Sequence, residues 1–441
     1  MMEFIITGGK PLYGSIRLGG AKNSSFKLMI ASLLCQGESR LLNLPHISDV
    51  EVTKAIITDL GGSVRSAGER TFFIDTKKFI SQKVSSKYGS ISRASAMFLP
   101  VLLARFGRAE VPLPGGDKIG SRPLNWHLTG LEQMGAVITQ QKGMMVAEAK
   151  VLKGISYRFP KNTHTGTETL ILAAVLARGK TVLENAALEP EVDDLMDYLN
   201  KMGAKIRRRE GRVIEVFGVK RLTPAIHQIM PDRNEAVSYA CAAIATKGDI
   251  IVENARKDDI ETFLEKLEEA GGGYEVGNYG VRFYYRGKLK ATDVITRPHP
   301  GFMSDWQPLW AVMLTQATGT SVIHEAVHSY RFHYVSDLVR MGAKIKTYQP
   351  AVGDEKRFYN FDFQPGEAEA SHAIKISGPT DLVGGEFKVH DLRAGATLVL
   401  AGLVAKGTSR LMAIEQIDRG YEDLDGRLRS MGAEIRRKTS R

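Results

Sequence analysis

Apolar and polar positions follow a pattern that recurs six times along the chain, at intervals of roughly 70 residues. Each unit begins with an apolar stretch of helical length, reaches a glycine about fourteen residues after the predicted helix start, and continues into a β-branched or apolar strand. The predicted starts and their glycines are Asn23 with Gly37, Arg93 with Gly107, Thr165 with Gly179, Asn234 with Gly248, Asp305 with Gly319, and Arg393 with Gly407. We expect each glycine to cap the carboxyl end of its helix.

A second, amphipathic helix follows in every unit and ends at another glycine. This glycine stands in a Gly-Gly pair or in a Met-Gly-Ala sequence, and a further strand completes the unit. The glycines are Gly61, Gly135, Gly203, Gly271, Gly342 and Gly432. The pattern therefore predicts six α/β modules.

The first helix of each unit is apolar on nearly every side, as in LILAAVLA (170–177) and TLVLAGLVA (397–405). Such helices are buried inside a domain, so the strands and the amphipathic helices have to lie outside them. A chain of 441 residues exceeds what one hydrophobic core normally supports. The predicted fold class is α/β, with two domains that are each an inside-out α/β barrel of three units.

The amino ends of the buried helices should point the same way within a domain, where their partial positive charge favours anions. Cationic residues stand beside four of these ends, namely Lys22, Arg93, Arg233 and Arg393. An arginine at a helix amino end opposes the helix dipole unless an anion binds there. The alternative is that the arginines pair with nearby carboxylates such as Asp391 and Asp232. At the third start, residues 165–168 (TGTE) have the sequence of a capping box.

Residues 113–123, LPGGDKIGSRP, occupy a strand-to-helix connection in the second unit. Three glycines and two prolines in so short a run indicate a shaped loop. Such a loop can be a simple connector, but Asp117, Lys118 and Arg122 favour a lid over an anionic site.

Charge and cysteine usage exclude several function classes. The net charge of +11 is spread along the chain rather than gathered into a stripe with interleaved aromatics, which argues against nucleic acid and suits small polyanionic substrates. Cys35 and Cys241 lie in apolar helical patterns as core residues, and neither a CxxC pair nor HExxH spacing indicates a metal site. Because the sequence has neither a secretory signal nor an apolar run of membrane-spanning length, we expect a cytoplasmic protein without a membrane partner.

A family resemblance is carried by GGAKNSSFKL, SRASAMFLPVLLARFG, LPGGDKIGSRP, LENAALEPEV, MPDR, PHPGFMSD, YRFHYVSDLVRMGA, HDLRAGATLVLAG and IDRGYEDL. In order and spacing these segments resemble the bacterial UDP-N-acetylglucosamine 1-carboxyvinyltransferases over nearly the whole chain. The resemblance implies a first domain over residues 22–230, which carries the lid loop, and a second over residues 1–21 plus 231–441. It also implies an active site in the cleft between the domains, with no metal or organic cofactor.

The resemblance further implies transfer of the enolpyruvyl group of phosphoenolpyruvate to the 3′-hydroxyl of UDP-N-acetylglucosamine, with release of phosphate. The implied partners of phosphoenolpyruvate are Lys22, Arg93, Arg122, Arg331, Arg393 and Arg419. The implied partners of the UDP-sugar are Asn23, Arg93, Pro123, Leu124, Asn125, Lys161, Thr163, His164, Asp305 and Val327. Asp305 is the implied base for the attacking hydroxyl, Asp117 is the candidate acid for C3, and Lys22 and Arg393 complete the catalytic set.

Four positions depart from the family pattern. Asp117 stands where many members have a cysteine, which predicts that fosfomycin, an epoxide that alkylates this cysteine, leaves the protein unmodified. Asn125 and Trp126 stand where aspartate and leucine are commoner, and Thr165 stands where glycine is usual. Trp126 either stacks on a base or fills an apolar gap.

Two other functions fit parts of the pattern. A paralogous transferase would use another sugar nucleotide or shikimate 3-phosphate as its acceptor, although the LPGG loop fits the sugar-nucleotide branch better. A catalytically silent protein of the same fold would use its basic surface to bind RNA or to regulate. The presence of Lys22, Asp305, Arg393 and Arg419 favours an enzyme.

Overall fold

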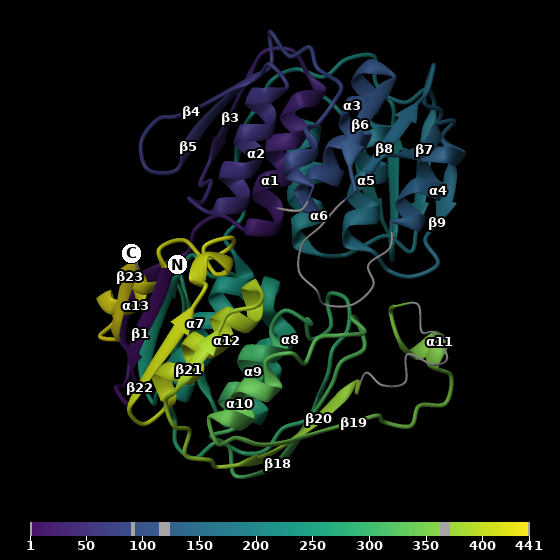
Figure 1. Ribbon diagram of the computed structural model, residues 1–441. Helices are drawn as coiled ribbons and strands as arrows, with labels where there is room; N and C mark the ends of the chain where they lie inside the picture. The colour runs from purple at the N-terminus through teal and green to yellow at the C-terminus, as the bar shows by residue number, and fades with distance from the viewer. Residues whose placement is uncertain (1, 90–92, 114–123, 362–370, 440–441) are drawn as a thin grey trace. The chain divides into compact units, whose positions relative to one another are not determined.

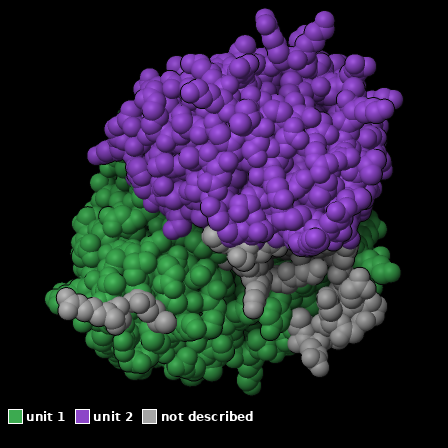
Figure 2. Space-filling model, turned by 45° about the horizontal axis from the view of Figure 1, so that its top comes forward, with its two compact units in different colours: residues 1–18, 117–121, 231–441 green, residues 19–116, 122–230 purple. Residues whose placement is uncertain are grey.

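The computed structural model describes residues 2–89, 93–113, 124–361 and 371–439. These residues form two compact units, which are coloured separately in Figure 2. Unit 1 contains residues 2–18 and 231–439, and unit 2 contains residues 19–113 and 124–230. The predicted boundary lay three residues later, between 21 and 22. Residues 19–21 lie in unit 2 because the Ala21 N–H donates to the Met230 carbonyl (2.8 Å) and Gly20 packs against the backbone of Asn43.

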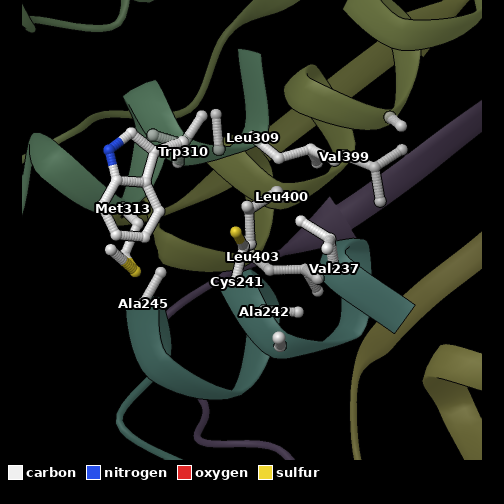
Figure 3. Close-up of a cluster of buried hydrophobic side chains, with 14 of the residues drawn as sticks. Val237, Cys241, Ala242, Ala245, Leu309, Trp310, Met313, Val399, Leu400 and Leu403 are labelled. Carbon is white, nitrogen blue, oxygen red and sulfur yellow. The ribbon is translucent and has the colours of Figure 1, made fainter. Parts of the chain in front are cut away.

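The six predicted apolar helices are present in the described residues, three in each unit (Figure 1). They are α1 (Lys22–Ala31), α3 (Phe98–Phe106) and α5 (His164–Ala174) in unit 2, and α7 (Arg233–Ala245), α9 (Gln307–Leu314) and α12 (Leu392–Val404) in unit 1. Every residue of α7 and α9 is buried, and α12 is buried up to Leu403. Figure 3 shows Cys241 of α7, Trp310 of α9 and Leu403 of α12 in one apolar cluster of unit 1. The helices are therefore inside the unit, as predicted.

The described strands form six sheets, three in each unit, with one buried face and one exposed face. In unit 2 their orders are β13-β3-β5-β4, β6-β8-β7 and β11-β12-β10-β9, and in unit 1 they are β15-β16-β14-β2, β17-β18-β20-β19 and β21-β22-β1-β23. Each four-stranded sheet combines antiparallel pairs with one parallel edge strand. In the three-stranded sheet, a parallel bridge between Lys83 and Glu110 stands in place of that edge strand. The six modules thus share one topology.

The strands of unit 2 are β3 (Glu38–Leu42), β4 (Ser63–Ser66), β5 (Thr71–Asp75), β6 (Arg108–Pro112), β7 (Val137–Gln141), β8 (Met144–Glu148), β9 (Ser156–Arg158), β10 (Lys180–Glu184), β11 (Lys205–Arg209), β12 (Val213–Phe217) and β13 (Ile226–Gln228). Those of unit 1 are β1 (Met2–Thr7), β2 (Tyr13–Arg17), β14 (Asp249–Glu253), β15 (Gly273–Gly277), β16 (Gly280–Tyr284), β17 (Val294–Ile295), β18 (Gly319–His324), β19 (Lys344–Tyr348), β20 (Ala373–Gly378), β21 (Glu386–Lys388), β22 (Thr408–Met412) and β23 (Glu434–Thr439). Short 3₁₀ helices are η1 (Ser32–Leu34), η2 (Ser86–Tyr88), η3 (Arg93–Met97), η4 (Lys257–Ile260) and η5 (Ile414–Gln416).

The second helix of each module ends at the predicted glycine. These helices are α2 (Ser48–Asp59), α4 (Asn125–Gln133), α6 (Pro190–Lys201), α8 (Glu261–Glu269), α10 (Val335–Arg340) and α13 (Leu424–Ser430), and a short α11 (Glu355–Phe358) lies between β19 and β20. The six glycines have φ between +85° and +101°. Glycine adopts this left-handed conformation without a steric penalty, so the predicted helix ends are confirmed.

The glycines after the apolar helices were expected to be C-caps, and this prediction is wrong for five of the six. Only Gly107 directly follows its helix, with φ +74° and its N–H bonded to Leu103. In the other modules the helix ends three or more residues before the glycine. There the glycine lies in the turn that leads into the next strand, except for Gly319, which is the first residue of β18. Before Gly248 it is Lys247 that adopts the left-handed conformation (φ +61°).

Candidate active site

Aspartates cap the amino ends of two of the three buried helices in unit 1, α7 and α12. The Asp232 carboxylate accepts the N–H groups of Asn234 (2.7 Å) and of the following residue (3.1 Å) at the start of α7. Asp391 caps α12 in the same way, through two backbone N–H groups at 2.9 Å each. The indole N–H of Trp306, which precedes α9, donates to the Asn234 side chain (3.0 Å). The starts of α7 and α9 therefore lie side by side.

Asp305 lies two residues before α9 and pairs with two arginines. Arg331 Nη2 is 2.6 Å from Oδ1, and Arg393 Nη2, in the first turn of α12, is 3.2 Å from Oδ2. The arginine side chains are only 4% and 7% exposed, whereas Asp305 is 24% exposed. Three residues that the family resemblance assigns to substrates are thus in direct contact, with two buried positive charges around one carboxylate.

Arg393 has a second fixed partner in the Tyr421 hydroxyl, which lies 3.1 Å from Nη1 and 2.7 Å from the Ser238 hydroxyl. Burial alone would lower the pKa of Arg393, but Tyr421 and the Asp305 carboxylate raise it overall, so the guanidinium stays charged. The sequence left open that the arginines at the helix starts pair with nearby carboxylates such as Asp391. Arg393 does pair with a carboxylate, but that carboxylate is Asp305. Sequence reasoning missed Ser238, whereas Tyr421 lies within the IDRGYEDL segment.

Arg419 precedes Tyr421 in a segment that a buried ion network ties to α7. Arg419 Nη1 is 3.4 Å from Gln416 Oε1. Arg427 pairs with Glu422 (3.0 Å) and with Glu235 of α7 (2.9 Å). Burial raises the pKa of Glu235 to about 6, although the charge of Arg427 opposes the shift. The network positions the segment that carries Arg419, and nothing in the sequence pattern predicted it.

In unit 2, Lys22 and Asn23 begin α1. Lys22 Nζ is 3.0 Å from Asp49 in the first turn of α2, and its side chain is 14% exposed. One turn later Lys27 pairs with Glu168 of α5 (2.6 Å). His164 Nε2 lies 3.1 Å from Lys27 Nζ, which brings the starts of α1 and α5 together.

The predicted capping box at Thr165 and Glu168 is wrong. The N-cap of α5 is Thr163, whose hydroxyl accepts the Gly166 N–H (3.1 Å). Glu168 is directed to Lys27 instead, because a buried ammonium offers a charge-assisted bond that a backbone N–H does not. The Thr165 hydroxyl bonds to His127 Nε2 (2.9 Å).

The remaining assigned residues are distributed over both units. Leu124 is half-buried before α4, Asn125 is exposed at its first position, and Lys161 is half-buried before α5. Val327 is half-buried beyond β18 in unit 1. Arg93 begins η3. Asp117, Arg122, Pro123 and all but the first residue of the predicted lid loop lie outside the described residues.

Trp126 fills an apolar gap rather than standing free. Its side chain is half-buried against the core of unit 2, and its carbonyl accepts the Tyr157 hydroxyl (3.0 Å). Of its two predicted roles, the packing role is the one that these contacts support.

Comparisons with known proteins agree with this architecture. The family model of EPSP synthase (3-phosphoshikimate 1-carboxyvinyltransferase) matches residues 6–428. The UDP-N-acetylglucosamine 1-carboxyvinyltransferase of Protochlamydia amoebophila is 40% identical over 98% of this chain and 93% of the relative. That of Acidobacterium capsulatum is 42% identical over 99% of this chain and 96% of the relative.

Solved structures show the same fold. The enolpyruvyl transferase NikO from Streptomyces tendae superposes with a TM-score of 0.85 at 23% identity, covering 100% of this chain and 99% of that one. EPSP synthase from Acinetobacter baumannii gives a TM-score of 0.70 at 18% identity, with 100% of both chains covered. The α/β fold class and the family predicted from the sequence are therefore confirmed. Together with the match over residues 6–428, these findings establish that the chain belongs to the EPSP synthase family of enolpyruvyl transferases.

Proposed function

We propose that the protein transfers the enolpyruvyl group of phosphoenolpyruvate to the 3′-hydroxyl of UDP-N-acetylglucosamine and releases phosphate, the first committed step of peptidoglycan synthesis. Relatives named for this activity match nearly the full chain at about 40% identity. The observation that carries the proposal is Asp305 held between the buried Arg331 and Arg393. The proposed place of the reaction is the cytoplasm.

The chemistry of the transfer requires a base near clustered positive charge. The sugar hydroxyl adds to C2 of the enol while C3 is protonated. The resulting tetrahedral ketal then loses phosphate from C2 and a proton from C3, which restores the double bond. Asp305 accepts the hydroxyl proton, which its partly exposed carboxylate permits. Arg331 and Arg393 provide fixed positive charge for the phosphate and carboxylate of phosphoenolpyruvate. The ion pairs with Asp305 keep both arginines oriented before the anion binds.

The proposal draws on residues of both units. Lys22, Arg93, Arg122 and Arg419 complete the set of cations for phosphoenolpyruvate. Asn23, Pro123, Leu124, Asn125, Lys161, Thr163, His164 and Val327 bind the UDP-sugar. Asp117 supplies the proton for C3, in the place where many relatives use a cysteine. These roles rest on the resemblance, and the contacts within unit 1 support those of Asp305, Arg331 and Arg393.

A phosphate-release assay tests the proposal. The protein is incubated with phosphoenolpyruvate and, in separate reactions, UDP-N-acetylglucosamine, UDP-glucose or shikimate 3-phosphate. We expect phosphate release with UDP-N-acetylglucosamine and a product whose mass shows that one enolpyruvyl group has replaced a hydroxyl hydrogen of the acceptor. Release only with shikimate 3-phosphate would assign the chain to the other branch of its family. Release with none of the acceptors would reject the proposal.

A further inference from the structure

Glu325 is a buried carboxylate that follows β18 and has no assigned role. Glu325 is only 1% exposed. Oε1 accepts the Thr296 hydroxyl (2.8 Å) and the N–H groups of Val327 (2.8 Å) and His328 (3.0 Å). Oε2 accepts the Ser304 hydroxyl (2.8 Å). Four donors therefore converge on one carboxylate, which is what a buried anion requires in order to be tolerated.

Three of these four donors belong to the two segments that carry candidate catalytic groups. Ser304 immediately precedes Asp305, and Val327 and His328 begin the turn that reaches Arg331. Asp305 and Arg331 are themselves in contact, through Oδ1 and Nη2 at 2.6 Å. The two segments are thus joined in two ways. One link is the ion pair between Asp305 and Arg331, and the other is Glu325, which accepts hydrogen bonds from both segments.

Glu325 itself has a fixed position. Its N–H donates to the His372 carbonyl (2.8 Å), and the next carbonyl, of Ala326, accepts the Asn360 N–H (2.7 Å). The Thr296 hydroxyl, which donates to Glu325, also accepts the Ala326 N–H (2.8 Å). Both backbone and side chain of the carboxylate's segment are therefore tied to neighbouring strands and loops.

We propose that Glu325 is a positioning residue for the reaction proposed above: it holds the Ser304–Asp305 and Val327–Arg331 segments in register, so that Asp305 and Arg331 keep the geometry that the transfer needs. Glu325 does not touch the reacting atoms. It acts through Ser304 on one side and through two backbone N–H groups on the other. A misplacement of about 1 Å in such a site can lower the rate by about 10²-fold.

Ser304→Ala tests the inference by removing the link to Asp305 and leaving the three bonds to Oε1 in place. Ser321→Ala is the matched control, because Ser321 is also buried in this region and its hydroxyl accepts a single backbone N–H, that of Thr292 (3.0 Å). We expect Ser304→Ala to lower kcat for phosphate release at least tenfold and to change KM for either substrate less than threefold. Ser321→Ala should keep kcat within twofold. Ser304→Thr, which retains the hydroxyl, should recover most of the lost kcat.

Hydrogen exchange of the substrate-free protein provides a readout that does not depend on activity. In Ser304→Ala and Glu325→Gln, peptides covering residues 303–306 and 326–331 should exchange at least threefold faster than in Ser321→Ala. Equal kcat and equal exchange in Ser304→Ala and its control would overturn the inference while leaving the proposed function intact. A wild-type protein that releases no phosphate would reject the proposed function, and the exchange rates alone would then decide whether Glu325 holds the two segments together.

Discussion

Lys27 of α1 and Glu168 of α5 form an ion pair inside unit 2, with Nζ 2.6 Å from Oε2 and side chains that are 2% and 0% exposed. Removing one partner leaves an uncompensated buried charge, whereas replacing both with apolar groups does not. We expect Lys27→Met to lower the free energy of unfolding by about 3–5 kcal/mol. The double variant Lys27→Met/Glu168→Leu should recover most of that loss.

Urea denaturation of the two variants and the wild type measures this effect. The substitution at Lys27 leaves Lys22 unchanged, so activity assays at a temperature where all variants are folded control for damage to the site. A single variant that is as stable as the double variant would contradict the role of the pair.

The Tyr421 hydroxyl contacts Nη1 of Arg393, whereas Asp305 contacts Nη2, and the same hydroxyl also contacts Ser238. Tyr421→Phe removes a hydrogen bond to a charged group, worth about 1.5–3 kcal/mol. We expect kcat/KM for phosphoenolpyruvate to fall by about 10-fold or more, because the loosened guanidinium binds the transition state less well. Tyr198→Phe is the matched control, since its hydroxyl is buried against Ser32 in the other unit. Equal kcat/KM values for the two variants would show that Tyr421 does not position Arg393.

Glu235 makes the stability of the protein depend on pH. Burial raises its pKa to about 6, above the ordinary value of 4.5, despite the opposing charge of Arg427. Because the folded state favours the protonated form, the stability from this group is complete below about pH 4.5 and is lost as the pH rises through about 6. Relative to Glu235→Gln, the wild type should lose about 2 kcal/mol between these conditions and neutral pH. Urea titrations from pH 4.5 to 7.5 measure the difference, and a difference that is constant with pH would contradict the assignment.

The module pattern was predictable because local features determine it. An apolar helix such as α7 has to be buried on every side, and a glycine such as Gly203 ends its amphipathic helix by adopting the left-handed conformation (φ +100°). The pairing of side chains was not predictable in this way. Asp305 is separated in the sequence from Arg331 by 26 residues and from Arg393 by 88 residues. Their contacts therefore depend on how the modules pack.

Local sequence motifs also predicted the hydrogen bonds at helix starts only in part. Asp232 and Asp391 cap their helices by accepting backbone N–H groups, as is common for aspartate at this position. The TGTE sequence at 165–168 matches the capping-box pattern, but no capping box forms there. Glu168 has a stronger partner in Lys27, which is 141 residues away in the sequence. A local motif therefore fails where a distant charge competes for the same side chain.

Fosfomycin provides a chemical test of the lid-loop sequence. Asp117 stands where many relatives have the cysteine that this epoxide alkylates, and a carboxylate is a far weaker nucleophile than a thiolate. We expect the wild type to keep its full rate of phosphate release after incubation with fosfomycin and phosphoenolpyruvate. Asp117→Cys should lose activity with time and gain the mass of one inhibitor molecule. A covalent adduct on the wild type would contradict the prediction.

Thr165 departs from the glycine that is usual at its position, and its hydroxyl bonds to the buried His127 (2.9 Å) rather than standing free. The departure is therefore explained by packing within unit 2. Thr165→Gly removes this hydrogen bond and places glycine in the first turn of α5, which together should cost about 1–3 kcal/mol of stability. Because the hydroxyl is already committed to His127, KM for UDP-N-acetylglucosamine should change less than twofold, and Thr165→Ser should match the wild type in both respects. Thermal unfolding and steady-state kinetics separate the two effects: a large rise in KM without a loss of stability would mean that Thr165 contacts the acceptor itself.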